Sequence, residues 1–214
     1  MTLVLDESTA RTAASVTSGN PLRRPVVVFR TEFDNRPVPL SFLWILAPFT
    51  AKLALVPETA YLSLGSNLGD RAANLRAAIA QLDVAGRLLA VSALYETQPV
   101  DVPDQPWFLN CVAAIETDKT ARELFQIALH VEAAMGRLRM REKGPRKIDI
   151  DVVLFGDRVM DEPGLKIPHP AMHQRRFVLE PLVEIAPEVH HPQLSKTARE
   201  LLAALAGEQT VRRL

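Results

Sequence analysis

The sequence has a single cysteine, Cys111. One thiol cannot form an intrachain disulfide, and it cannot build a zinc site from cysteines alone, so both are excluded. The residue lies in the apolar run 109–115, where we expect a buried and unreactive thiol rather than a nucleophile. Such sparse use of cysteine is typical of proteins from a reducing compartment.

The chain also lacks net charge and a long apolar segment. Its 214 residues include 25 Lys and Arg and 25 Asp and Glu, so the formal net charge is zero. A neutral chain is not expected to bind nucleic acid or membrane surfaces through bulk charge. The longest apolar run, 38–51, contains Pro39 and Pro48, and it is shorter than the roughly 20 residues of a membrane span. No signal peptide is recognisable, and we expect a cytoplasmic protein.

Several motifs of nucleotide sites and hydrolases are missing. The glycines in 65–69 are not followed by the lysine of a phosphate-binding loop. The kinase motifs and the G-x-S-x-G elbow are absent as well. His169 and His173 have a spacing that can bind zinc on a helix, but Pro170 prevents a regular helix there. A nucleotide site in this chain must therefore depend on arginine, histidine and a metal ion.

Residues 1–58 differ in composition from the rest of the chain. The segment 2–20 is rich in Ser, Thr and Ala, and prolines recur from Pro21 to Pro57. No helical or strand period is sustained, so we expect a partly disordered N-terminal extension without an assigned function. Its apolar patch at 42–46 could contact the main domain or a partner. The main domain is expected at 59–208, followed by a C-terminal tail, 209–214.

The hydrophobic pattern of the main domain predicts the element order βαββαβ. Strands are expected at 60–65, 88–95, 108–115 and 148–153, with a strand-free loop at 96–107 and a hairpin around 156–157 that reaches 167. Helices are expected from Asp70 to Gly86 and at 120–135, 173–185 and 197–205. This order is that of the α+β ferredoxin-like fold, an antiparallel sheet with helices packed against it.

The strand at 148–153 carries an acidic pair. Its apolar residues alternate with Asp149 and Asp151, and side chains two apart on a strand share a face. Their Cα atoms should be roughly 6.5–7 Å apart, at about 3.3 Å per residue. Carboxylates this close suit hard cations, above all Mg²⁺ pairs that hold transferring phosphoryl groups. An exposed edge strand would tolerate the same pattern, but Asp is a poor strand former, which favours function.

Basic residues surround this acidic pair in the sequence. The segment 136–147 contains six Lys and Arg, and the guanidinium group matches phosphate geometry. The alternative is a solvated charged loop, but the segment leads directly into Asp149. His169, with Arg175 close in sequence, is suited to hydrogen bond a phosphate.

Two phenylalanines and an amide suggest a site for a flat molecule. Phe108, Asn110 and the distant Phe177 could form an aromatic slot with a polar end, which suits a heterocycle. The alternative is that both phenylalanines belong to the core, and the residues alone favour this alternative.

Four segments together resemble the family of 6-hydroxymethyl-7,8-dihydropterin pyrophosphokinase, an enzyme of folate biosynthesis. They match in order and spacing over about residues 59–192, at 60–70 (AYLSLGSNLGD), 95–110 (YETQPVDVPDQPWFLN), 136–156 (GRLRMREKGPRKIDIDVVLFG) and 167–187 (IPHPAMHQRRFVLEPLVEIAP). The resemblance implies a ferredoxin-like fold. It also implies an ATP-dependent diphosphokinase that transfers pyrophosphate to the pterin hydroxymethyl group and releases AMP.

The resemblance implies roles for individual residues. The metal ligands would be Asp149 and Asp151, which would bind two Mg²⁺ ions. The catalytic residues would be Arg137, Arg146, Asp149 and Asp151. ATP would be bound by Glu132, Arg137, Arg139, Arg146, Lys166, His169 and Arg175. The pterin would be bound by Thr97, Val100, Phe108, Asn110 and Phe177.

Two positions depart from the family pattern. Lys143 stands where an aromatic residue often precedes Gly-Pro-Arg, and Asp101 stands where a small residue is common. The main alternative function is a non-catalytic ferredoxin-like module that binds nucleotide or RNA, which should have a basic sheet face with exposed aromatics. The acidic pair and the zero net charge favour the enzyme. We therefore expect a monomer with small-molecule substrates and with no nucleic-acid or membrane partner.

Overall fold

The structure is a computed structural model that describes residues 14–15, 28–29, 57–100, 104–136, 144–206 and 209–214. The chain divides into two compact units, Met1–Ala51 and Lys52–Leu214. In the first unit the described residues form β1 (Ala14–Ser15) and β2 (Val28–Phe29), which pair antiparallel. The apolar patch expected at 42–46 lies outside the described residues.

The second unit is built on a six-stranded antiparallel sheet. An inner strand, β3 (Glu58–Ser66), pairs with β6 (Phe108–Thr117) on one side and with the edge strand β7 (Asp149–Phe155) on the other. Two short strands, β4 (Arg87–Val91) and β5 (Tyr95–Thr97), pair one after the other with the far side of β6. The last strand, β12 (Val211–Arg213), pairs with β5 at the edge of the sheet.

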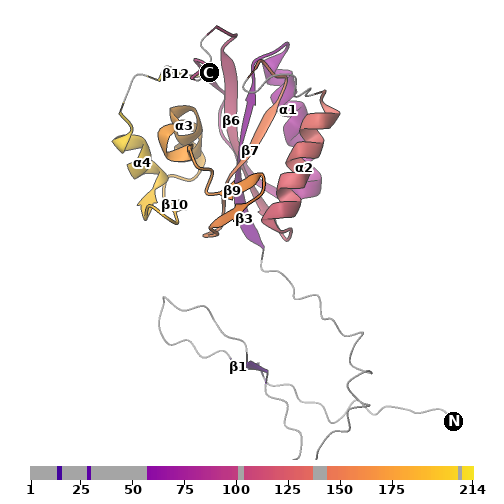
Figure 1. The fold of residues 1–214 in the computed structure, drawn as a ribbon, viewed down its shortest axis with the longest axis vertical. Coiled ribbons are helices and arrows are strands. Elements are labelled where there is room, and N and C mark those ends of the chain that lie inside the picture. The colour runs from indigo at the N-terminus through magenta and orange to yellow at the C-terminus, as the bar shows by residue number, and fades with distance from the viewer. Residues whose placement is uncertain (1–13, 16–27, 30–56, 101–103, 137–143, 207–208) are drawn as a thin grey trace, which may run out of the picture. The chain divides into compact units, whose positions relative to one another are not determined.

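Helices cover both faces of this sheet (Figure 1). On one face lie α1 (Arg71–Gln81) and α2 (Ala121–Ala134), and on the other lie α3 (Arg176–Ile185) and α4 (Ala198–Ala204). The predicted βαββαβ order and the ferredoxin-like fold are confirmed. None of the described helices has the length and apolar character that crossing a membrane requires.

Short elements complete the fold. They are the 3-10 helices η2 (Leu82–Ala85) and η3 (Met172–Gln174), the hairpin of β8 (Met160–Glu162) and β9 (Leu165–Ile167), and the pair β10 (His190–His191) and β11 (Lys196–Thr197).

The sheet divides the hydrophobic core into two parts, because strand side chains alternate between its faces. Leu62 and Leu64 pack toward α1 and α2, whereas Val112 and Val153 pack toward α3 and α4.

Local signals in the sequence set the helix ends. Asp70 is the N-cap of α1, and its carboxylate accepts a 2.9 Å hydrogen bond from the backbone N–H of Ala73. Thr120 begins α2 with a capping box that it forms with Glu123. Gly86 follows η2 with φ of +150°, a conformation that favours glycine. These three positions explain why α1 and α2 begin, and η2 ends, where the sequence pattern predicts.

Four predicted elements differ from the structure. The strand expected at 88–95 is divided into β4 and β5, and β5 also includes Glu96 and Thr97 from the expected loop. The hairpin turns at 163–164 rather than 156–157, because β8 pairs with β9. The helix expected at 173–185 is interrupted at Arg175, whose backbone is extended. The expected tail, 209–214, contains β12, because the outer edge of β5 is available for pairing.

Candidate active site

The candidate site lies on the α3 side of the sheet, where the apolar packing ends. Tyr61, Val112 and Val153 lie on three neighbouring strands and pack with α3. Two residues away on the same strands, the same face carries Ser63, Asn110 and Asp151, which line a pocket. The site therefore occupies the end of the sheet at which β3 ends and β6 and β7 begin.

Small residues of β3 form the base of this pocket. Ser63 pairs with Asp151 across β7, and Gly65 lies between Asp149 on β7 and Asn110 on β6. A Cβ atom at Gly65 would lie 2.6 Å from Oδ1 of Asn110, so any side chain there would force the Asn110 amide to shift. Glycine at this position therefore leaves room for Asn110 and keeps the pocket open.

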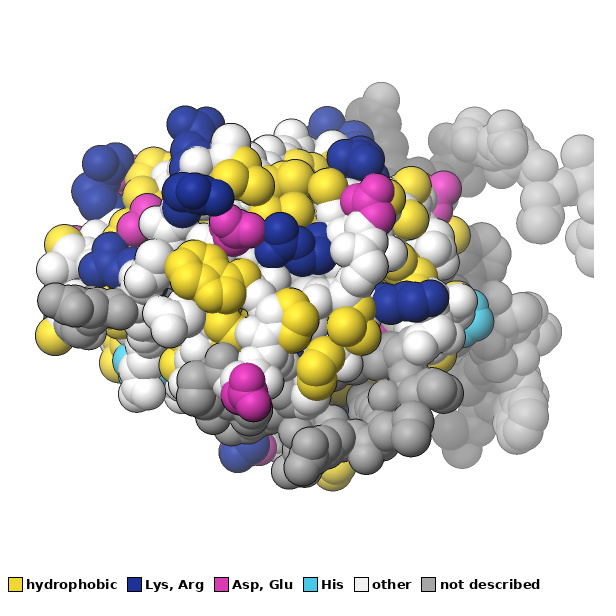
Figure 2. All heavy atoms as spheres, turned by 90° about the horizontal axis from the view of Figure 1, so that it is seen from above, with side chains coloured by type: hydrophobic (Ala, Val, Ile, Leu, Met, Phe, Trp, Pro, Cys, Tyr) yellow, Lys and Arg dark blue, Asp and Glu magenta, His cyan; other side chains and the backbone are white. Residues whose placement is uncertain are grey.

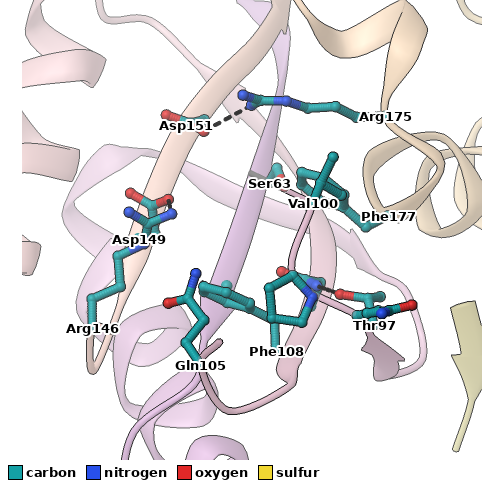
Figure 3. Close-up of a pocket in the computed structure, with 14 residues that line it drawn as sticks. Ser63, Thr97, Val100, Gln105, Phe108, Arg146, Asp149, Asp151, Arg175 and Phe177 are labelled. Atoms are coloured by element: carbon teal, nitrogen blue, oxygen red, sulfur yellow. Dashed lines mark hydrogen bonds and ion pairs between the residues drawn. The ribbon is translucent and has the colours of Figure 1, made fainter. Parts of the chain in front are cut away.

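Asp149 and Asp151 both line the pocket, on one face of β7 (Figure 3). Oδ2 of Asp149 lies 2.9 Å from a guanidinium nitrogen of Arg146. Oδ2 of Asp151 lies 3.9 Å from Nε2 of His169 and 3.9 Å from a guanidinium nitrogen of Arg175. The side chains are 20% exposed for Asp149 and 42% exposed for Asp151, so both carboxylates can be reached by a ligand.

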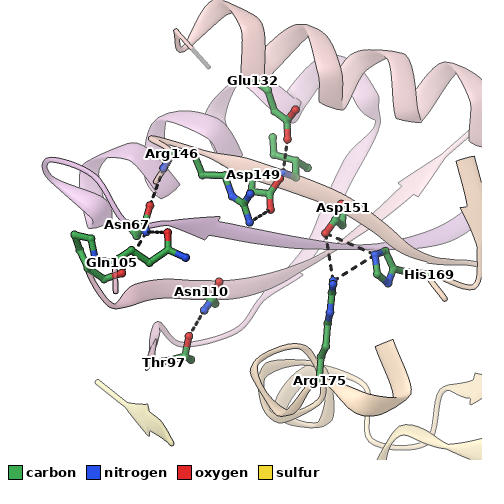
Figure 4. Close-up of polar contacts among 12 residues, drawn as sticks. Asn67, Thr97, Gln105, Asn110, Glu132, Arg146, Asp149, Asp151, His169 and Arg175 are labelled. Carbon is green, nitrogen blue, oxygen red and sulfur yellow. Dashed lines mark hydrogen bonds and ion pairs between the residues drawn. The ribbon is translucent and has the colours of Figure 1, made fainter. Parts of the chain in front are cut away.

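A buried carboxylate from α2 contacts β7, the strand that carries the two aspartates (Figure 4). Glu132 on α2 is 3% exposed. Its Oε1 accepts a 2.7 Å hydrogen bond from the backbone N–H of Ile150, the residue between the two aspartates. Glu132 therefore contacts the strand that carries the acidic pair, and it is not among the described residues that line the pocket.

His169 is neutral and directs its ring toward Asp151. Burial, together with the charge of Arg175, lowers the pKa of His169 to about 4. Its Nδ1 accepts a 3.2 Å hydrogen bond from the backbone N–H of Ala171, and its Nε2 lies 3.4 Å from a guanidinium nitrogen of Arg175. Nε2 is also the nitrogen nearest Asp151, so a ligand that binds beside the carboxylate would meet this edge of the ring.

Two aromatic rings from different elements line the pocket. Phe108 comes from β6 and Phe177 from α3. Each ring lies beside a guanidinium group, with Arg146 5.4 Å from the centroid of Phe108 and Arg175 5.5 Å from that of Phe177. Asn110 lies at the base, where its Nδ2 donates a 2.7 Å hydrogen bond to Oγ1 of Thr97.

The structure brings most of the predicted site residues together. The predicted residues that line the pocket are Thr97, Val100, Phe108, Asn110, Arg146, Asp149, Asp151, Arg175 and Phe177. Lys166 and His169 instead line a second hollow, which Asp151 also borders. Nζ of Lys166 lies 3.0 Å from Oδ2 of Asp161 within the β8–β9 hairpin. Arg137, Arg139, Lys143 and Asp101 lie outside the described residues.

Sequence reasoning missed five uncharged residues of the site. The pocket is also lined by Ser63, Gly65, Gln98, Pro99 and Gln105. A glycine inside a strand pattern often marks a close approach of another group, so Gly65 carried a usable signal. Ser63 carried none, because its place beside Asp151 depends on the register between β3 and β7.

The charged side chains at this end do not form a continuous basic surface. Figure 2 views the molecule from the end of the sheet that holds the pocket, and its Lys and Arg side chains are dispersed among hydrophobic and acidic ones.

Comparisons with known proteins identify the family. The sequence matches the family model of 7,8-dihydro-6-hydroxymethylpterin-pyrophosphokinase (HPPK) over residues 61–187. The 2-amino-4-hydroxy-6-hydroxymethyldihydropteridine pyrophosphokinase of Methylorubrum extorquens is 48% identical over 149 residues, which cover 68% of this chain and 92% of that protein. The protein of the same name from Pseudomonas aeruginosa is 40% identical over 153 residues, 71% of this chain and 94% of that protein.

Longer proteins also match. The folic acid synthesis protein fol1 of Schizosaccharomyces pombe is 42% identical over 153 residues, which cover 71% of this chain and 21% of that protein. Among solved structures, the wild-type HPPK-DHPS of Plasmodium falciparum has a TM-score of 0.58 at 16% identity, over 69% of this chain and 44% of that chain. This chain thus spans less than half of these longer proteins, and the structural likeness at such low identity shows the fold alone.

Proposed function

This chain belongs to the 7,8-dihydro-6-hydroxymethylpterin-pyrophosphokinase family and is an ATP-dependent pyrophosphokinase of folate synthesis, and we propose how its pocket carries out the transfer. The acceptor is the hydroxymethyl group of 6-hydroxymethyl-7,8-dihydropterin, and the donor is ATP. The acceptor oxygen bonds to the β-phosphorus while the bond between that phosphorus and the α-phosphate oxygen breaks. The products are AMP and the pterin diphosphate.

The pterin is proposed to lie in the pocket between Phe108 and Phe177. Two aromatic side chains suit a flat bicyclic ring, and the amide of Asn110 with backbone groups near Thr97 and Val100 would bind its polar edge. Because Asn110 is held by its hydrogen bond to Thr97, its amide is oriented before the pterin arrives. Such an arrangement reduces the entropy that binding must overcome.

The observation that carries the proposal is the position of Asp151 at the border of the pocket and of the second hollow. The nucleotide is proposed to occupy the second hollow, with Lys166 and His169 among its contacts. Its phosphates would then point toward Asp151 and meet the acceptor at the border. Reactants held side by side in this way need no covalent help from the protein.

The acidic pair fits Mg²⁺. Asp149 and Asp151 offer hard oxygen donors on one face of β7, and Mg²⁺ in proteins is usually bound by one or two carboxylates together with substrate phosphates and water. We propose two ions at this pair. Asp149 and Asp151 would hold these ions, which when bound would neutralise part of the phosphate charge.

The remaining charge of the phosphates would be balanced by side chains of the chain itself. Arg146 and Arg175 line the pocket and are held near the two aspartates, and each can donate two hydrogen bonds to a phosphate. His169 would hydrogen bond a phosphate oxygen through Nε2. Arg137 and Arg139 are proposed as further phosphate ligands, and Glu132 is proposed to support the nucleotide site through β7.

We also propose that the protein works as a monomer in the cytoplasm. The single cysteine, Cys111, supports the second part of this proposal, because sparse use of cysteine is typical of a reducing compartment.

The proposal is tested by incubating the full-length protein with ATP, Mg²⁺ and 6-hydroxymethyl-7,8-dihydropterin. We expect AMP and pterin diphosphate in equal amounts. ADP in place of AMP would show that a different phosphate bond breaks, and the absence of a pterin product would refute the function. A reaction without pterin measures background hydrolysis of ATP.

A further inference from the structure

One buried asparagine joins two segments that line the pocket from different sides. Asn67 lies in the turn between β3 and α1 and is 2% exposed. It is not among the described residues that line the pocket. Its hydrogen bonds reach Arg146 on one side and the segment 105–106 on the other (Figure 4).

The first set of contacts fixes the backbone of Arg146. The backbone N–H of Asn67 donates to the carbonyl oxygen of Arg146 at 3.1 Å, and Oδ1 of Asn67 accepts from the backbone N–H of Arg146 at 2.7 Å. Arg146 precedes β7, so no strand pairing holds it. Its side chain lies between Asp149 and Phe108, and the position of that guanidinium group therefore depends on Asn67.

The second set of contacts fixes the segment that precedes Phe108. Nδ2 of Asn67 donates to Oε1 of Gln105 at 3.1 Å and to the carbonyl oxygen of Pro106 at 3.2 Å. Gln105 lines the pocket, and Pro106 lies two residues before Phe108. The side chain of Asn67 thus donates to one segment and accepts from the other. Asparagine is suited to this because its short amide provides both donors and an acceptor.

We propose that Asn67 is a positioning residue that holds Arg146 and the segment 105–106 at a fixed separation. The inference rests on the proposed function, because the separation matters only if pterin binds beside Phe108 and phosphate binds beside Arg146. Pterin affinity depends on one set of contacts and turnover on the other. A change at Asn67 should therefore affect both, although the residue touches neither substrate.

Three variants of the full-length protein separate the two sets of contacts. Asn67→Ala removes all three side-chain hydrogen bonds and keeps the backbone one. Asn67→Asp keeps an acceptor for the N–H of Arg146 but places an oxygen against the carbonyl of Pro106. Asn74→Ala is the matched control, since Nδ2 of Asn74 on α1 donates to Ser66 Oγ at 3.2 Å and to the Leu68 carbonyl at 2.8 Å, and among the described residues it bonds to neither Arg146 nor the segment 105–106.

Steady-state kinetics give the first measurement. For Asn67→Ala we expect the KM for pterin to rise and kcat to fall, each by about tenfold, as expected for the loss of one or two hydrogen bonds. For Asn67→Asp we expect a similar rise in the KM for pterin, with kcat within about twofold of wild type because the contact with Arg146 is kept. For Asn74→Ala we expect both constants within about twofold of wild type.

Trp107 provides a second measurement that needs no substrate. It follows Pro106 and is 40% exposed, and the only other tryptophan of the chain is Trp44. In a Trp44→Phe background the fluorescence therefore reports on this segment alone. We expect Asn67→Ala to increase the acrylamide quenching constant by about twofold, because the segment opens more often, and Asn74→Ala to leave it unchanged.

The outcomes separate a positioning role from a structural one. If folded Asn67→Ala matches Asn74→Ala in kinetics and in quenching, the inference is wrong. A lower Tm with unchanged kinetics and quenching would also refute it. If Asn67→Ala does not fold, the same comparison with Asn67→Asp decides. An inactive wild-type protein would refute the proposed function instead, and the quenching of Trp107 would still decide whether Asn67 holds the segment.

Discussion

Glu132 and Ile150 are joined by a 2.7 Å hydrogen bond between a buried carboxylate oxygen and a backbone N–H. Glu132 belongs to α2, which packs on the face of the sheet opposite the pocket. Because Ile150 separates the two aspartates in sequence, the register of the acidic pair depends on a residue that faces away from it.

This contact predicts different effects for two substitutions of Glu132. Glu132→Gln keeps an oxygen acceptor for Ile150, and we expect most of the stability and activity to remain. Glu132→Leu leaves the buried N–H of Ile150 without this acceptor, and we expect the free energy of unfolding to fall by about 1–3 kcal/mol. Urea unfolding of both variants measures the difference. Equal losses for the two variants would show that the hydrogen bond is not what Glu132 contributes.

The acidic pair predicts a loss of turnover without a loss of fold. Asp149→Ala or Asp151→Ala should reduce kcat by several orders of magnitude, because each removes a proposed Mg²⁺ ligand. Asp157→Asn is the control, since Asp157 is an exposed carboxylate just beyond the other end of the same strand. Kinetics at several Mg²⁺ concentrations and circular dichroism test this prediction. Near-full activity of either alanine variant would contradict the metal assignment.

We expect the base of the pocket to tolerate a side chain at position 65 poorly. Gly65→Ala places a methyl group against Oδ1 of Asn110, and we expect it to cost about 1–3 kcal/mol of stability and to weaken pterin binding. The double variant Gly65→Ala, Asn110→Ala removes the clash but also removes the amide. We expect it to recover stability and not pterin affinity, as measured by Tm and equilibrium binding. Recovery of both would mean that Asn110 does not bind the pterin.

Much of the fold could be predicted from the sequence because its signals are local. Asp70 and Thr120 are N-caps that the sequence places directly before periodic apolar segments. The strand β12 could not be predicted in this way. Its three residues are stabilised by pairing with β5 and by ion pairs of Arg212 with Glu96 and of Arg213 with Glu184. Such partners are distant in sequence, and no local pattern reveals them.

The candidate site was predictable where charge or aromaticity marked it. Asp149, Asp151 and Phe108 stand out by residue type, and the structure places all three at one pocket. Asn67 and Ser63 have common side chains, and their positions follow from strand register and turn geometry. The roles of the site residues in binding and catalysis stay predictions, and those of Arg137 and Arg139 concern residues outside the described part of the chain.

Tyr95 predicts a stability change at high pH. Burial, followed by a 2.8 Å hydrogen bond to Glu184, raises the pKa of Tyr95 to about 12. An unfolded tyrosine ionises near pH 10, so the unfolded state releases this proton first. Stability from this group is therefore complete below about pH 10 and is lost between about pH 10 and 12. Urea unfolding across this range should show a steeper decline for wild type than for Tyr95→Phe, and identical slopes would contradict the assignment.

The edge strand β12 has a practical consequence for anyone who produces this protein. The backbone N–H of Leu214 donates to the carbonyl oxygen of Leu94 at 2.9 Å, and β12 pairs with the strand that carries Thr97. An affinity tag joined to Leu214 would begin beside Leu94, directly after the last strand of the sheet, and cleavage that trims the last residues would remove part of the sheet. Purification handles are therefore better attached before Met1.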